Sequence, residues 1–253
     1  MEFLGNRSVR IAYHSEGEQD AKAVLLVHGF ASNSEANWVR AGWIAPLLEA
    51  GFRVVTVDLR GHGHSDRSRD PGFYRVENFL DDLNAVLNEL AIDRVGYIGY
   101  SFGSRIGWEF AWKYPSRVAK LVLGGMPLRD PFDDFDVPAA LHALASGAPV
   151  GHEPTGRYLS MMSALPSNDP RALVSLIAGA RVTRFDAVAH HPEQRTLLVA
   201  GDQDTIAAGA EVLAGSLANV SFMALLGRSH TNAITARAFK TAAIEFLADH
   251  ASG

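Results

Sequence analysis

Residues 95–106 read Val-Gly-Tyr-Ile-Gly-Tyr-Ser-Phe-Gly-Ser-Arg-Ile, and this stretch decides the fold class of the 253-residue chain. Its first four residues form a short apolar run that predicts a buried strand. The next five residues match Gly-x-Ser-x-Gly, and apolar residues at helical spacing follow them. A serine in a sharp strand-to-helix turn is held clear of the backbone, and the flanking glycines tolerate the crowding. The stretch therefore predicts a strand–turn–helix unit with Ser101 at its corner.

The Gly-x-Ser-x-Gly match is weak by itself, because the chain contains 23 glycines and such matches arise by chance. The alternative is a glycine-rich turn that carries an ordinary serine. The position of the motif between a strand and a helix favours a reactive serine, since the helix N-terminus would place partial positive charge beside it.

Similar short apolar runs recur along the chain and predict strands buried on both faces, as in a parallel sheet. Residues 76–90 separate two of these runs and have apolar side chains on one helical face. Alternation of strands and helices predicts an α/β fold. The other apolar runs are residues 24–27, 53–57, 121–123, 196–200 and 220–224.

One segment, residues 127–191, breaks this alternation. It has no clear buried strand and contains many prolines, which interrupt regular elements. We therefore expect an insertion of short helices and loops between two strands of the sheet.

Composition excludes several classes of protein. Charged residues make up 20% of the chain and hydrophobic residues 47%, a balance that excludes intrinsic disorder. The net charge of −5 leaves no basic surplus for a nucleic-acid partner. With no cysteine there are no disulfides, thiolate zinc sites or cysteine nucleophile. No apolar run approaches the ~20 residues that cross a bilayer, and no signal peptide is evident, so we expect a cytoplasmic protein without membrane contact.

A reactive serine needs a base, and the base needs an acid that orients it. His230 follows the apolar run at residues 220–224, and Asp204 follows the run at residues 196–200. Parallel strands end at one edge of a sheet, so both residues are expected near Ser101. Taken singly, a loop histidine is often solvated and an aspartate after a strand is often a helix cap. The chain order Ser101, Asp204, His230 favours a catalytic triad.

Four motifs together resemble the α/β-hydrolase superfamily, in its serine-nucleophile, capped branch. They are His28-Gly29-Phe30, residues 58–65, residues 99–103, and the late aspartate and histidine. The resemblance extends from Lys22 to the C-terminal helix. It implies an α/β-hydrolase fold with a mostly parallel eight-stranded sheet, helices on both faces and a small helical cap. The implied core domain is residues 1–126 and 192–253, and residues 127–191 would be the cap or lid.

The resemblance also assigns roles to individual residues. It implies that Ser101 is the nucleophile, His230 the base and Asp204 the acid. The backbone N–H groups of Phe30 and Phe102 would form the oxyanion hole, which stabilises negative charge on the substrate oxygen.

Two other aspartates and one histidine pair remain alternatives. Asp202 is expected to support its turn, and Asp130 occupies a position where some families of this fold carry the acid. The spacing of His62 and His64 could also indicate a metal site, but the family loop accounts for this segment. We expect no metal and no cofactor.

A serine nucleophile favours acyl chemistry over the dehalogenases and epoxide hydrolases of this fold, which use an aspartate. We expect a carboxylesterase-like hydrolase of small or medium apolar esters; a lactonase, thioesterase, amidase or carbon–carbon bond hydrolase remains open. The alternatives are a perhydrolase, cofactor-free oxygenase or lyase on the same scaffold, or a small-molecule receptor. The expected partner is a small ester-like substrate, and the expected state is a monomer or homodimer.

Overall fold

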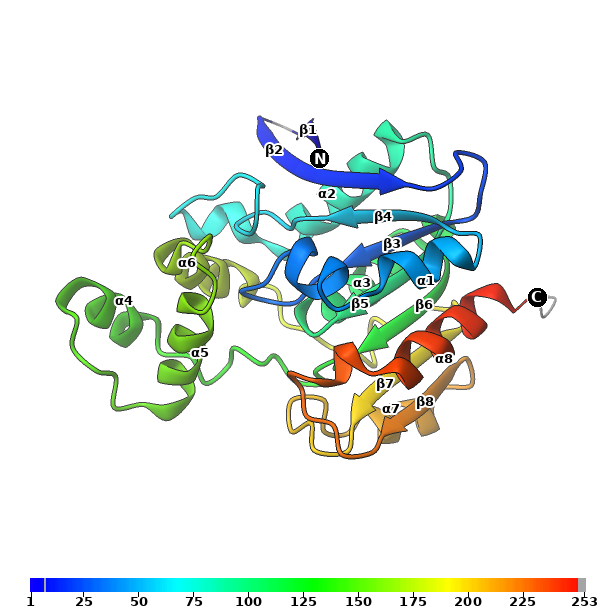
Figure 1. The fold of residues 1–253 in the computed structure, drawn as a ribbon. Coiled ribbons are helices and arrows are strands. Elements are labelled where there is room, and N and C mark those ends of the chain that lie inside the picture. Colours follow the sequence, from blue (N-terminus) through cyan, green and yellow to red (C-terminus); the bar gives the residue numbers. More distant parts are fainter. Residues whose placement is uncertain (7, 250–253) are drawn as a thin grey trace.

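An eight-stranded sheet forms the centre of the molecule in a computed structural model that describes residues 1–6 and 8–249 (Figure 1). Residues 250–253, part of the predicted core domain, lie outside the described residues. The strand order is β1-β2-β4-β3-β5-β6-β7-β8. The strands are β1 (Glu2–Asn6), β2 (Val9–Glu16), β3 (Ala23–Val27), β4 (Arg53–Val57), β5 (Val95–Tyr100), β6 (Val118–Gly124), β7 (Thr196–Gly201) and β8 (Val220–Leu225).

The predicted fold class is confirmed. Strands β3 to β8 coincide with the apolar runs of the sequence, and they pair in parallel. Strands β1 and β2 were not predicted, and they pair in antiparallel fashion at one edge of the sheet. Because they are exposed along much of their length, their sequences lack a continuous apolar run.

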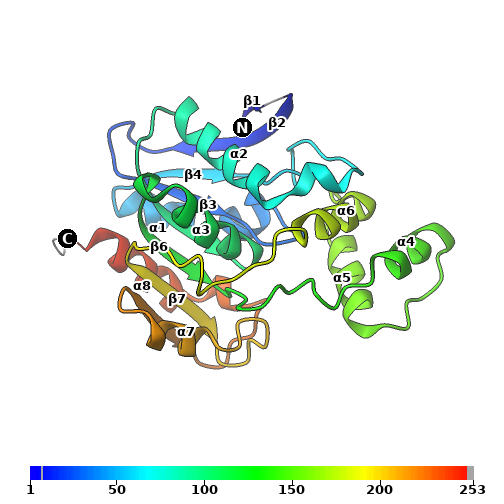
Figure 2. The ribbon, with the colours of Figure 1, turned by 180° about the vertical axis from the view of Figure 1, so that it is seen from behind.

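Helices cover both faces of the sheet, as expected. One face carries α1 and α8, and the other carries α2, α3 and α7 (Figures 1 and 2). Each face has its own buried apolar cluster, for example Leu47 and Phe239 on one side and Leu83 and Ile106 on the other. The helices are α1 (Ile44–Glu49), α2 (Val76–Glu89), α3 (Phe102–Lys113), α7 (Ala210–Ser216) and α8 (Arg237–Ala248), with short turns at η1 (Glu35–Val39), η2 (Pro71–Tyr74), η3 (Pro115–Arg117) and η4 (Ala233–Thr235).

The first turn of α3 packs directly against the end of β3. A Cβ atom on Gly103 would lie 2.1 Å from the carbonyl oxygen of Val27, so this approach requires glycine. The contact brings the start of α3 next to the loop that follows β3.

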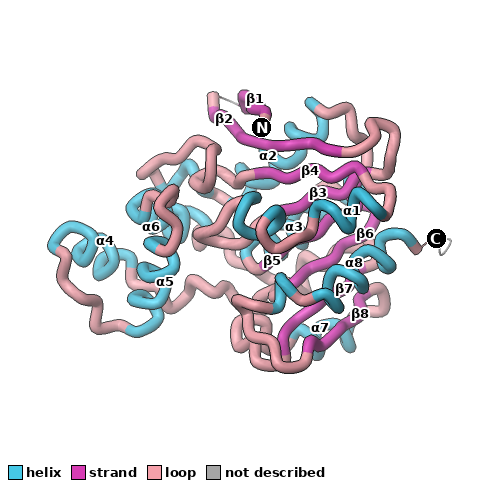
Figure 3. Tube along the Cα trace, viewed as in Figure 1, coloured by secondary structure: helices cyan, strands magenta, loops and turns pink. Residues whose placement is uncertain are grey.

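Between β6 and β7 the chain forms three helices that lie outside the sheet. They extend beyond the ends of the central strands, at the left of Figure 1, and Figure 3 shows the loops that separate them from the sheet. Gly179 lies in the third of these helices, and a Cβ atom on it would be 2.1 Å from the carbonyl oxygen of Pro71. The third helix therefore packs closely against the segment between β4 and α2. The three helices are α4 (Val137–Ser146), α5 (Glu153–Ser163) and α6 (Pro170–Ala180).

Arg105 joins α3 to both ends of this helical segment. The side chain is fully buried, and its Nη1 lies 2.6 Å from Oδ2 of Asp130, before α4. Its Nη2 donates to the carbonyl oxygens of Ala180 and Thr183, at the end of α6, over 3.3 and 2.9 Å. A buried guanidinium needs this many acceptors, because its charge is costly to remove from water.

Among the described residues, no helix combines the length and apolar character required to span a bilayer.

Candidate active site

Ser101 lies at the sharp turn between β5 and α3, as the motif predicts. Its φ of +54° and ψ of −115° fall in a region that residues other than glycine rarely adopt. Its N–H donates to the carbonyl oxygen of Gly124 over 2.8 Å, which holds the turn. A Cβ atom on Gly29 would approach the Cβ of Ser101 to 3.3 Å. The side chain is partly exposed at this corner, so it is both strained in backbone and open to a reactant.

The structure brings Ser101, His230 and Asp204 together in one hydrogen-bonded row. Nε2 of His230 lies 2.9 Å from Oγ of Ser101, and Nδ1 of His230 lies 2.8 Å from Oδ2 of Asp204. The three residues follow β5, β8 and β7, so each stands at the carboxyl end of a parallel strand.

The surroundings of Asp204 determine which nitrogen of His230 carries the proton. Asp204 is buried, and its Oδ1 accepts the N–H groups of Ile206 and Ala207 over 3.0 and 3.1 Å. A carboxylate oxygen can only accept a hydrogen bond. Nδ1 of His230 therefore donates to Asp204, and Nε2 is free to accept the Oγ–H of Ser101.

Tyr100 also fixes the position of His230. Its hydroxyl donates to the carbonyl oxygen of His230 over 2.6 Å. Burial and the nearby charge of Asp204 raise the pKa of Tyr100, so the hydroxyl remains a donor at neutral pH. No motif predicts this role, because Tyr100 occupies a variable position of the Gly-x-Ser-x-Gly pattern.

The two alternative aspartates have other partners. Asp130 pairs with Arg105, and Oδ1 of Asp202 accepts the N–H of Arg228 over 3.2 Å. The second contact joins the loop after β7 to the loop after β8. The geometry thus places Asp204, and neither alternative, on the imidazole of His230.

Two backbone N–H groups near Ser101 are available to a substrate oxygen. Phe102 is the first residue of α3, where an N–H has no acceptor within the helix. On either side of Phe30, the N–H of Gly29 donates to Asn37 Oδ1 over 2.8 Å and that of Ala31 to His62 Nε2 over 3.0 Å. Within the described residues, no hydrogen bond satisfies the N–H of Phe30 or of Phe102.

Two neutral histidines support the loop after β3: His28 lies at its start, and His62 is hydrogen-bonded to Ala31 within it. His28 and His62 are fully buried, and burial lowers the pKa of both, that of His62 to about 3 with His28 as a further cause. Nε2 of His28 accepts the N–H of Leu59 over 3.0 Å, so it carries no proton. His62 is fully buried whereas the His64 side chain is 64% exposed, and the described residues include no group of three or more possible ligands placed to hold a metal ion.

A cluster of aromatic rings extends from the two free N–H groups to α5. The ring of Phe132 lies 5.0 Å from Phe30 and 5.7 Å from Phe102, and Tyr158 lies 5.5 Å from Phe132. All four side chains are almost completely buried. Burial raises the pKa of Tyr158 to about 12, so its hydroxyl stays protonated and donates to the carbonyl oxygen of Pro131 over 2.8 Å.

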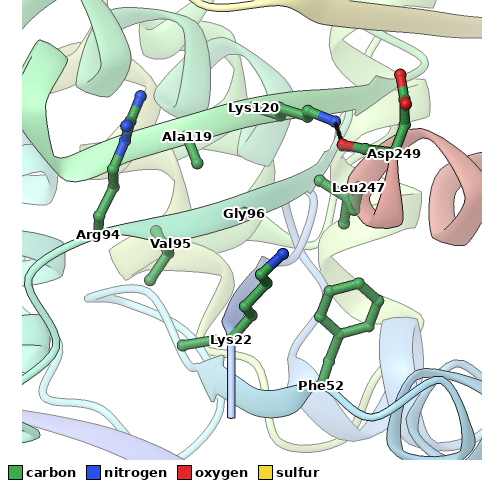
Figure 4. Close-up of a pocket in the computed structure, with 10 residues that line it drawn as sticks. Lys22, Phe52, Arg94, Val95, Gly96, Ala119, Lys120, Leu247 and Asp249 are labelled. Carbon is green, nitrogen blue, oxygen red and sulfur yellow. Dashed lines mark hydrogen bonds between the residues drawn. The ribbon is translucent and has the colours of Figure 1, made fainter. Parts of the chain in front are cut away.

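A cavity of about 290 Å³ lies at the opposite edge of the sheet (Figure 4). Its wall includes the side chains of Phe52, Arg94 and Leu247, near the points where β3, β5 and β6 begin. Ser101 lies at the other end of β5, so this cavity is separate from the row of Ser101, His230 and Asp204.

Comparison with known proteins agrees with the fold. The family model described as alpha/beta hydrolase fold matches residues 22–144. Epoxide hydrolase B of Mycobacterium tuberculosis is 34% identical over 122 residues, which cover 47% of this chain and 33% of that protein. The chain thus spans about a third of the length of this curated relative.

Solved structures align over almost the entire chain. One of the carboxylesterases of the thaumarchaeon Nitrososphaera gargenis superposes with a TM-score of 0.79 at 18% identity, covering 98% of both chains. The enol-lactonase of Burkholderia xenovorans gives 0.78 at 23% identity, covering 98% of this chain and 100% of the other. Since the sheet order, the helices on both faces and the family match agree, the chain has the α/β-hydrolase fold.

Proposed function

We propose that the protein is a serine hydrolase that cleaves small or medium apolar carboxylic esters through an acyl-enzyme. The observation that carries this proposal is the row from Ser101 Oγ through His230 to Asp204, with links of 2.9 and 2.8 Å. Both links lie within the range that proton transfer between a nucleophile and its base requires.

The reaction follows from this geometry. His230 Nε2 takes the proton of Ser101 as Oγ attacks the ester carbonyl, and Asp204 stabilises the resulting imidazolium. Negative charge develops on the carbonyl oxygen and is stabilised by the N–H groups of Phe30 and Phe102. His230 then gives its proton to the leaving alcohol, which leaves an acyl group on Ser101. Water releases the acid by the same steps, with His230 again as the base.

Residues 127–191 act in this proposal as a cap over the catalytic core, residues 1–126 and 192–253. Helices α4 to α6 stand beyond the carboxyl ends of the strands, where the reacting serine lies (Figure 1). The aromatic cluster around Phe132 joins the cap to the oxyanion hole and supports an apolar, short acyl group. No charged group belongs to this cluster, which favours an uncharged substrate.

The proposal favours esters over epoxides despite the match to an epoxide hydrolase. Members of this fold that open epoxides use an aspartate nucleophile, whereas residue 101 is a serine. The aligned segment covers only a third of that relative, so its activity does not extend to this chain.

Turnover of 4-nitrophenyl esters provides the test. We expect hydrolysis of the acetate and butyrate with a burst of nitrophenol, and a fluorophosphonate should label Ser101, as located by peptide mapping. A panel of thioesters and lactones of matched acyl length separates the hydrolase subclasses. Absence of both turnover and labelling would refute the serine-hydrolase assignment and favour a receptor or a non-hydrolytic enzyme.

A further inference from the structure

The loop between α5 and α6 is hydrogen-bonded to the loop that carries the N–H of Phe30. Nδ2 of Asn168 donates to the carbonyl oxygen of Ala31 over 2.9 Å. The two residues are 137 positions apart, and this bond joins the helical segment directly to the residue after Phe30.

Ala31 adopts a backbone conformation that needs external support. Its φ is +55°, in the left-handed region that an alanine rarely adopts. His62 accepts its N–H over 3.0 Å, and Asn168 donates to its carbonyl oxygen. Hydrogen bonds therefore fix both the backbone N–H and the carbonyl group of Ala31. Because Phe30 directly precedes Ala31, the direction of the Phe30 N–H depends on these two bonds.

Asn168 is itself fixed from two sides. Its N–H donates to the carbonyl oxygen of Leu165 over 3.0 Å. Arg67 donates to the carbonyl oxygens of Ser167 and Gly63 over 2.8 and 2.7 Å, which ties the Asn168 loop to the loop after β4.

The side-chain oxygen of Asn168, Oδ1, is buried and has no hydrogen-bond partner among the described residues. Burial of an unsatisfied amide oxygen is unfavourable, so the side chain is retained at a cost to stability. Such a cost points to a role for the Nδ2 donor other than stability.

We propose that Asn168 is a positioning residue for the oxyanion hole. By fixing the carbonyl of Ala31, it keeps the N–H of Phe30 directed toward the oxygen that becomes negative in the transition state. The cap thereby contributes to catalysis without touching the reacting atoms. The inference rests on the proposed serine-hydrolase function and names how one part of that site is held.

The test compares Asn168→Ala and Asn168→Asp with a Ser167→Ala control. The exposed side chain of Ser167 does not take part in these contacts, because Arg67 binds its carbonyl oxygen. We expect kcat to fall about tenfold in Asn168→Ala with KM little changed, since misplacing a donor costs less than the 10²–10³-fold of losing it. Asn168→Asp should lose more, because a carboxylate oxygen would face the Ala31 carbonyl. The control should match the wild type.

A trifluoromethyl ketone, which forms a tetrahedral adduct on Ser101, separates positioning from a merely structural role. Its inhibition constant should rise in parallel with the loss of kcat, while the KM for the ester stays level. If Asn168→Ala does not fold, Arg67→Ala provides the same test from the exposed side of the contact, with an expected loss of about threefold.

Amide hydrogen exchange tests the same contact and does not depend on catalytic turnover. In Asn168→Ala, exchange of the Ala31 N–H should accelerate while that of the core strands is unchanged. Unchanged exchange, or unchanged kcat and inhibition constant in an active enzyme, would overturn the inference. A wild type that neither turns over esters nor reacts with fluorophosphonate would instead refute the proposed function, and the exchange result would still decide whether Asn168 holds the loop.

Discussion

Nε2 of His230 lies 2.9 Å from Oγ of Ser101, although the two residues are 129 positions apart in the chain. They come from the loops after β8 and β5, whose strands are separated in the sheet by β6 and β7. A parallel sheet fixes where each of these strands ends, so the distance between these two side chains is set by the core and not by the loops alone.

Replacement of Ser101 by alanine should remove activity and leave stability intact. Ester turnover should fall by at least about 10⁴-fold, because no other group can take the place of Oγ. The side chain is partly exposed and fills no space in the core, so the free energy of unfolding should stay within about 1 kcal/mol of the wild type. Initial rates and urea unfolding measure the two effects. A large loss of stability would mean that the serine has a structural role.

Asp204→Asn should impair the reaction severely. The asparagine cannot stabilise an imidazolium and favours the wrong tautomer of His230, so kcat should fall by about 10⁴-fold with the fold retained. Single-turnover kinetics and circular dichroism check these two outcomes.

Asp130→Asn should show the opposite behaviour. It leaves the fully buried Arg105 without its charged partner, which should lower the free energy of unfolding by about 3–5 kcal/mol. The kcat per folded molecule should stay within about twofold, because Asp130 does not contact His230. A loss of kcat comparable to that of Asp204→Asn would show that the acid had been misassigned.

Phe132→Leu should widen the range of acyl chains that the enzyme accepts. The ring of Phe132 contacts both Phe30 and Phe102, so a smaller side chain opens space beside the backbone N–H groups of these two residues. The ratio of kcat/KM for the octanoate over the acetate 4-nitrophenyl ester should rise about tenfold, as expected for a few more buried methylenes. Phe135→Leu is a suitable control, because Phe135 contacts Tyr158 from the other side. An equal change in both variants would contradict a specific role for Phe132.

The buried histidines should make stability depend on pH. The pKa of His62 is lowered to about 3 in the folded protein, whereas an unfolded histidine titrates near 6.5. Between these values the unfolded chain binds a proton that the folded chain does not, so stability falls as the pH falls below about 6.5. The slope should be at most about 1.4 kcal/mol per pH unit for this residue.

His62→Gln should flatten that dependence. Glutamine can still accept the N–H of Ala31 through Oε1, which takes the place of Nε2, but it does not titrate. Thermal unfolding between pH 4.5 and 7.5 should therefore show a smaller decrease at acid pH than the wild type, even if the variant is less stable at pH 7. Parallel curves for the two proteins would contradict the proposed neutral state of His62.

The part of the fold that was predictable is the part buried on both faces. Strands such as β3 and β7 read as continuous apolar runs, because every side chain meets a helix layer. Strand β1 has no fully buried residue, and its sequence therefore carries no such signal. Ser101, Asp204 and His230 could be placed near one another because each directly follows a predictable strand.

The remaining parts of the site depend on packing that a single sequence does not encode locally. The bond from Asn168 to Ala31 and the pair of Arg105 with Asp130 both arise from how α4 to α6 settle on the core. Residues in such contacts lie in proline-rich loops or in a helix, with no motif to distinguish them. The roles of Tyr100 and Asn37 are equally hard to predict from the sequence. Tyr100 acts through a hydrogen bond to the carbonyl oxygen of His230, and Asn37 accepts the N–H of Gly29.

The buried guanidinium of Arg105 also makes the helical insert separable. It binds Asp130 on one side and the carbonyls of Ala180 and Thr183 on the other, so both ends of the insert are bound to α3, which begins directly after Ser101. The chain between these ends can therefore be exchanged, provided that the loop carrying Asn168 and its bond to Ala31 are kept. Helices of different length or polarity on either side of that loop would give a new substrate range on an unaltered site around Ser101.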